Sequence, residues 1–114
     1  MPLRVVVVIR EDPFKSHRAV EALRIALGLS AGENPVTIVL LDGAPALLGP
    51  ESDEIVDADT LEKHLPVLKE LGVPFVLQAG ASARFSVDPQ FKIREDSSEN
   101  IQGLVRSADR VLLF

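Results

Sequence analysis

The feature that most constrains the fold is a nearly continuous run of β-branched residues close to the start of the chain. Residues 3–9 read LRVVVVI, and a run without polar alternation is typical of a strand that is buried on both faces. Such a strand needs helices on both sides of its sheet, and this arrangement accompanies parallel strands. The chain is therefore expected to fold as an α/β protein.

The rest of the chain repeats this pattern in alternation with helical segments. Further strands are predicted at Val36 to Leu41, at Val73 to Leu77, in FKIRE (residues 91–95, a short edge strand) and at Arg110 to Phe114. Helices are predicted after Ser16, from Asp59 to Gly72, from Ser82 and around Ile101 to Ala108. Pro66 predicts a kink or a division of the second helix, and residues 59–62 have the spacing of a capping box at its start.

Alternating strands and helices of this kind build right-handed βαβ units. We therefore predict one domain over residues 1–114, a three-layer α/β sandwich with a mostly parallel sheet of four to five strands in flavodoxin-like order. In such sheets ligands bind beyond the carboxyl ends of the strands. The three loops at these ends are Arg10 to Ser16, Asp42 to Leu48 and Gln78 to Arg84.

Composition excludes several classes of function. The chain has no cysteine, which removes disulfides, thiolate metal sites and thiol nucleophiles. Its two histidines are too few for a multi-histidine metal centre. A net charge of −5 argues against nucleic acid as a partner, and no apolar run approaches the roughly 20 residues that span a bilayer. The opening MPLRVVVVIRED predicts a strand rather than a secretory signal, so we expect a cytoplasmic protein without a membrane partner.

The stretch VPFVLQAGASAR, residues 73–84, predicts a buried strand that ends at Gln78 and opens into a loop of small residues. Backbone amides in this loop, with Arg84 as counter-charge, would suit a small anion. The alternative is that the small residues only let a helix approach the sheet closely. Neither a dinucleotide-binding nor a Walker-type glycine pattern is present.

Other candidate chemistries have weaker support. Glu11 and Asp12, with Asp42, imitate the magnesium site of a response-regulator receiver, but only one helix separates the first strand from Asp42, and a receiver places its phosphorylated aspartate after the third strand. Solvated loop acids are the simpler interpretation. His17 and His64 are expected to be structural or surface residues, and Ser16 is expected to cap the first helix. We predict no catalytic residue, no metal and no cofactor.

As a whole, the pattern resembles the DsrE/DsrF-like family, which includes the TusD-type sulfur-relay proteins. VVVVIREDPFKSHRAVEALRIALGL resembles the family's opening strand, loop and alanine-rich helix, and VTIVLLDGA resembles its second strand. LPVLKELGVPFVLQAGASAR is similar to the stretch in which a strand runs into a small-residue loop ending in Arg, and ADRVLLF fits the closing strand. The resemblance covers almost the full chain.

The resemblance implies a specific role for the end of the third strand. Sulfur-relay members carry a persulfide there on a cysteine, and this chain has Gln78 at that position. An amide donates and accepts hydrogen bonds but holds no persulfide. The resemblance also implies assembly as a homo-oligomer, trimer or hexamer, or as a hetero-oligomer with related subunits. Phe14, Phe85 and Phe91 are candidate interface contacts, with packing in the core as the alternative for each.

These observations lead to one preferred hypothesis and two alternatives. We expect an oligomeric DsrE-like protein without sulfurtransferase activity, linked to sulfur metabolism, that binds a small polar or anionic ligand or supports a partner. The predicted pocket consists of Glu11, Asp12, Lys15, His17, Gln78, Ala79, Gly80, Ser82 and Arg84. The alternatives are a non-thiol enzyme that uses His17 or the Glu11/Asp12 pair, and a purely structural subunit.

Overall fold

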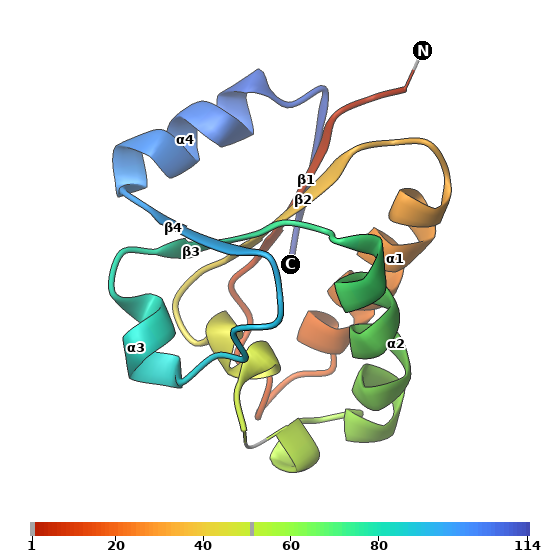
Figure 1. Ribbon diagram of the computed structural model, residues 1–114, viewed down its shortest axis with the longest axis vertical. Coiled ribbons are helices and arrows are strands. Elements are labelled where there is room, and N and C mark those ends of the chain that lie inside the picture. Colours follow the sequence, from red (N-terminus) through yellow and green to blue (C-terminus); the bar gives the residue numbers. More distant parts are fainter. Residues whose placement is uncertain (1, 51) are drawn as a thin grey trace.

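The computed structural model describes residues 2–50 and 52–114, which form five strands and four α-helices (Figure 1). The elements follow in the order β1 (Val5–Ile9), α1 (Arg18–Ala31), β2 (Val36–Leu40), η1 (Ala44–Leu48), η2 (Ser52–Glu54), α2 (Ala58–Leu71), β3 (Phe75–Gln78), α3 (Ala81–Phe85), β4 (Ile93–Asp96), α4 (Ser98–Ser107) and β5 (Arg110–Leu113), where η marks a 3₁₀ helix. Among these residues no helix is long and apolar enough to cross a membrane.

The strands form one parallel sheet in the order β4-β3-β2-β1-β5. The predicted fold class, a flavodoxin-like α/β sandwich around a mostly parallel sheet, is confirmed. The strand order differs from that of flavodoxin, because β1 lies between β2 and β5 rather than between β2 and β3. The chain adds β2, β3 and β4 in turn on one side of β1 and then returns to place β5 on the other side. The strand order therefore reverses between β1 and β5, which is where open α/β sheets form a crevice.

The two faces of the sheet are covered unequally. Figure 1 shows α1 and α2 on one side of the strands and α4 on the other. Alternate residues of β1 divide accordingly: Val5, Val7 and Ile9 belong to the larger core, which includes α1 and α2. Val6 and Val8 belong to a smaller cluster that packs on Ile101 of α4. The burial of all five β1 residues explains why its sequence lacks polar alternation.

The second helix, α2, is one element from Ala58 to Leu71. Of the two outcomes predicted at Pro66, a kink or a division of the helix, the division is therefore wrong. Leu61 and Leu68, both fully buried, anchor the helix before and after the proline, and their burial outweighs the hydrogen bond that Pro66 cannot donate. The predicted capping box is also wrong. The helix starts at Ala58, so Asp57 rather than Asp59 is the N-cap, with no side-chain cap bond.

Phe91, one of the three predicted interface phenylalanines, is a core residue. It is buried against Phe75, with ring centroids 5.5 Å apart and the planes at 80°. Lys69 covers the outer side of Phe91 with its ammonium nitrogen 4.7 Å from the ring centroid. The same nitrogen is 3.0 Å from a carboxylate oxygen of Asp88, and hydrogen bonds from the Gln90 backbone and from Lys69 lower the pKa of Asp88.

Candidate functional site

Gln78 is the last residue of β3 and lies half-buried at the carboxyl edge of the sheet. Its side-chain oxygen accepts a hydrogen bond from the backbone N–H of Asp42, with an N···O distance of 3.2 Å. Asp42 follows β2 and has a φ of 56°, a left-handed conformation that residues other than glycine seldom adopt. Gln78 therefore helps to fix the loop that follows the neighbouring strand.

Asp42 in turn contacts Arg10, which follows β1. The Nε atom of Arg10 is 3.3 Å from Oδ2 of Asp42, and their side chains are 68% and 56% exposed. An ion pair as open to solvent as this one contributes little to stability. The pair matters because of its position. It lies in a hollow of ≈ 530 Å³ at the point between β1 and β5 where the strand order reverses. The hollow is lined by Val8, Arg10, Glu11, Asp12, Asp42, Leu113 and Phe114.

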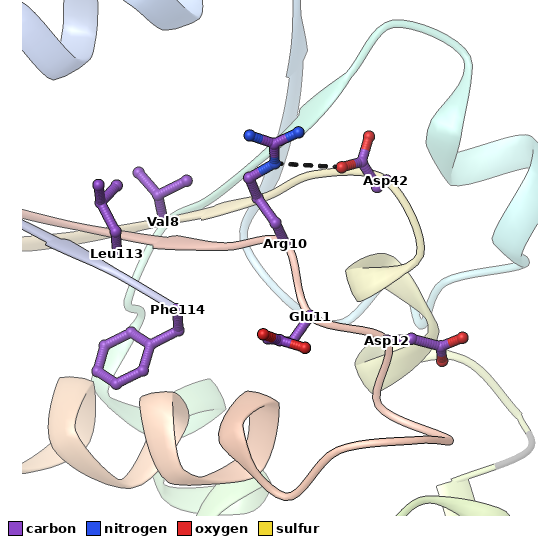
Figure 2. A pocket seen from close by; sticks show the side chains of 7 residues that line it. All are labelled: Val8, Arg10, Glu11, Asp12, Asp42, Leu113 and Phe114. Atoms are coloured by element: carbon purple, nitrogen blue, oxygen red, sulfur yellow. Dashed lines mark hydrogen bonds and ion pairs between the residues drawn. The ribbon is translucent and has the colours of Figure 1, made fainter.

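Figure 2 shows that this hollow extends over both sides of the sheet edge. Arg10, Val8 and Leu113 lie on the side of α4, whereas Glu11 and Phe114 lie toward α1. Glu11 pairs loosely with Arg18, at 3.8 Å, and the Arg18 guanidinium is 5.7 Å from the centre of the Phe114 ring.

The two acids that follow β1, Glu11 and Asp12, contact protein groups and do not converge on a common point as metal ligands would. The Asp12 carboxylate accepts the backbone N–H of Phe14 at 2.9 Å, which is a turn-forming contact. Over residues 2–50 and 52–114, no group of three His, Asp or Glu residues is placed to hold a metal ion. The geometry therefore gives no support to a receiver-like magnesium site.

A second hollow, the Gln78 hollow, has a volume of ≈ 300 Å³ and is lined by Gln78, Ala79, Arg84, Asp96, Ser97 and Ser98. Three of the predicted site residues, Gln78, Ala79 and Arg84, meet here. Asp96 already has partners, since its carboxylate is 3.1 Å from Nε of Arg94 and accepts a hydrogen bond from Asn100 at 2.8 Å. Arg84 has no acidic partner within 4.0 Å in the described part of the chain.

The backbone amides that were expected to cradle an anion already bind one. Gly80 N–H donates to Oε1 of Glu95 at 2.6 Å, and Ser82 N–H donates to Oε2 at 3.2 Å. The Ser82 hydroxyl contacts the same carboxylate. Glu95 lies on β4, so this contact fastens the loop after β3 to the edge strand. An external anion in this part of the site must bind Gln78 and Arg84 rather than the loop amides.

The remaining predicted residues lie apart from the Gln78 hollow. Lys15 and His17 are exposed and line neither hollow. No hydrogen bond joins His17 to Glu11 or Asp12 in the segments that the structure describes. The Ser16 hydroxyl accepts the N–H of Arg18 at 3.1 Å, which agrees with a capping role, although the N-cap position itself is His17.

Sequence reasoning missed Arg10, Glu95 and Asp96. Arg10 was named only as the start of a loop, and its pairing with Asp42 depends on two strands becoming neighbours. Glu95 and Asp96 belong to the edge strand that FKIRE predicted in part. Asp96 lies next to Gln78 because the two residues are partners in the pairing of β3 with β4. This pairing cannot be read from the sequence of either strand alone.

Comparison with known proteins identifies the fold. No protein family and no curated protein matches the chain. A crystal structure of the ychN protein from E. coli matches it with a TM-score of 0.76 and 20% identity, over 100% of both chains. This likeness shows a DsrE-like fold for the chain.

Proposed function

We propose that this chain is a cysteine-less DsrE-like protein linked to sulfur metabolism, without sulfurtransferase activity of its own, that binds a small oxyanion in the Gln78 hollow. One observation carries the proposal: an amide lies at the carboxyl end of β3, where the resemblance places the sulfur-carrying cysteine. The open hollow beside Gln78 supports ligand binding over a purely structural subunit.

The chemistry of the hollow suits an oxyanion. The oxygen of the Gln78 side-chain amide accepts a hydrogen bond from the Asp42 backbone N–H, and no described residue accepts a hydrogen bond from the side-chain nitrogen of Gln78. This nitrogen is a donor for a ligand. Arg84 adds a guanidinium, whose planar donors match two oxygens of one anion. Donors from both residues would bind a group such as thiosulfate or sulfate.

Titration with thiosulfate tests this site. We expect saturable shifts of the backbone amide signals of residues 78, 79, 84 and 97 in ¹H–¹⁵N NMR spectra of the wild-type chain. Arg84→Gln should weaken binding by about 10-fold or more, because hydrogen bonds to charged groups contribute roughly 1.5–3 kcal/mol. Lys15→Gln removes the same charge outside the hollow and should leave the affinity unchanged. Equal losses in both variants would show general charge attraction and contradict the site.

Self-association belongs to the same proposal. Leu113 on the edge strand β5 is 69% exposed, the most of any large apolar side chain among the described residues. Arg10 and Asp42 line the same hollow, so the patch carries both charges beside an apolar centre. A patch that carries both charges beside an apolar centre suits an isologous contact, in which the same patch of a second copy faces it across a two-fold axis. We therefore propose that copies of this chain associate through Leu113.

Leu113→Glu should convert the oligomer to a monomer in light scattering coupled to size exclusion, because it buries a charge in the contact. Leu71→Glu is the matched control, since Leu71 on α2 is 51% exposed and lies outside the patch. An unchanged mass for Leu113→Glu, or a monomeric wild-type chain at all concentrations, would overturn this interface.

A further inference from the structure

A third hollow lies at the carboxyl edge of the sheet, and neither the oxyanion site nor the self-association proposed above makes use of it. It has a volume of ≈ 300 Å³ and is lined by Phe14, Ala46, Gly49, Pro50, Arg84, Phe85 and Ser86. These residues come from the β1–α1 loop, the end of η1 and α3, three segments that follow the carboxyl ends of β1, β2 and β3. We call it the Phe14 hollow. It shares Arg84 with the Gln78 hollow.

The walls of the Phe14 hollow are apolar and aromatic. Phe14 is 37% exposed, whereas Phe75 and Phe91 are buried in the core. The loop that carries it is ordered by Asp12, whose carboxylate accepts the Phe14 N–H at 2.9 Å and whose carbonyl accepts the Lys15 N–H at 3.1 Å. An aromatic ring held at the surface in this way offers area that a ligand can cover.

The hollow is preformed because backbone contacts hold together the segments that carry its lining residues. Asp88 N–H donates to the Leu48 carbonyl at 2.8 Å, which ties the end of η1 to the chain after α3. At Gly49 a Cβ atom would lie 3.0 Å from the Phe85 carbonyl oxygen, so a larger residue would push the two segments apart by a few tenths of an ångström. A ligand would therefore meet a rigid site rather than pay to order it.

Arg84 gives the hollow its charge preference. Its guanidinium carbon lies 4.8 Å from the centre of the Phe85 ring, a cation–π contact that orients the group. In the described part of the chain no carboxylate lies within 4.0 Å of it. A stacked arginine without an acidic partner is suited to bind a carboxylate through two parallel hydrogen bonds.

We infer that the Phe14 hollow binds a small carboxylate that carries an aromatic or branched apolar group, with the ring against Phe14 and Phe85 and the carboxylate on Arg84. The volume is at the lower end of the range for small-molecule sites, about 300–1,000 Å³. This site goes beyond the proposed oxyanion site, since it uses an apolar group that thiosulfate lacks and does not involve Gln78.

Phenylacetate is the probe, with phenylacetamide as a neutral analogue and acetate as an analogue without a ring. In ¹H–¹⁵N NMR titrations of the wild-type chain, phenylacetate should give saturable shifts at residues 14, 49, 85 and 86. Each analogue should bind at least about 10-fold more weakly than phenylacetate, because each lacks one of the two contacts. This comparison requires no substitution and so does not depend on the folding of a variant.

Two variants separate this site from the Gln78 hollow. Phe14→Ala should weaken the binding of phenylacetate and leave the binding of thiosulfate unchanged. Gln78→Met should weaken the binding of thiosulfate and leave the binding of phenylacetate unchanged. If phenylacetate binds and thiosulfate does not, the proposed function is contradicted and the carboxylate site stands. Equal affinity for phenylacetate and phenylacetamide, or shifts without saturation at residues 14, 49, 85 and 86, would overturn the carboxylate site.

Discussion

Replacement of Gln78 by cysteine is expected to produce a chain that carries a persulfide, which the cysteine-free wild type cannot do. The new thiol would lie half-buried at the end of β3, in the hollow that Arg84 also lines. A nearby guanidinium lowers the pKa of a thiol and so raises the thiolate fraction at neutral pH. The thiolate attacks a sulfur atom of an inorganic polysulfide, forms a new S–S bond and releases a shortened polysulfide.

Lys15→Cys is the matched control, because it places a cysteine at an exposed position outside the hollow. Intact-protein mass spectrometry counts the added sulfur atoms over time. We expect Gln78→Cys to load at neutral pH about 10-fold faster than Lys15→Cys, as a consequence of its lower thiol pKa. Equal rates would mean that position 78 has no special environment for sulfur, and the correspondence with the family's cysteine would fail.

Phe75→Ala is expected to have the largest effect on stability. Phe75 is fully buried in β3, and its ring packs on Phe91. Truncation of a buried phenylalanine costs about 3–5 kcal/mol, a large share of the roughly 5–15 kcal/mol that stabilises a typical domain. Urea unfolding followed by far-ultraviolet circular dichroism measures the loss, because the chain has no Trp or Tyr for fluorescence.

Phe14→Ala provides the control for this substitution, since it removes the same side chain from an exposed position. It should change the free energy of unfolding by less than about 1 kcal/mol. Similar losses in both variants would indicate that Phe75 is not the central core residue of the sheet, and would contradict the packing of β3 described here.

The strands could be predicted because burial on both faces leaves a local signal. Val5–Ile9 and Val36–Leu40 lie within the predicted runs, since β-branched residues in unbroken series suit few other structures. The edge strand Arg110–Leu113 is partly exposed and was predicted from a short apolar run alone. Helix ends were harder to predict. The N-cap of α2, Asp57, has a left-handed conformation and makes no side-chain cap bond, which no capping pattern indicates.

The candidate site could be predicted only in outline. Gln78 and Arg84 were identified from one short stretch, because strand ends in parallel sheets bind ligands. Their partners could not be found locally. Asp42 is 36 residues from Gln78 along the chain, and Glu95 is 15 residues from Gly80. These contacts depend on which strands become neighbours, and a pattern within one segment carries no such information.

We propose that Gln78 stands where sulfur-relay proteins carry their cysteine and that its amide faces a bound oxyanion. A crystal structure of the wild-type chain grown with thiosulfate would show this contact. We predict an anion within hydrogen-bonding distance of the Gln78 amide nitrogen and the Arg84 guanidinium, with the Gln78 oxygen still accepting from Asp42. An empty Gln78 hollow, with thiosulfate bound only elsewhere or not at all, would contradict the claim.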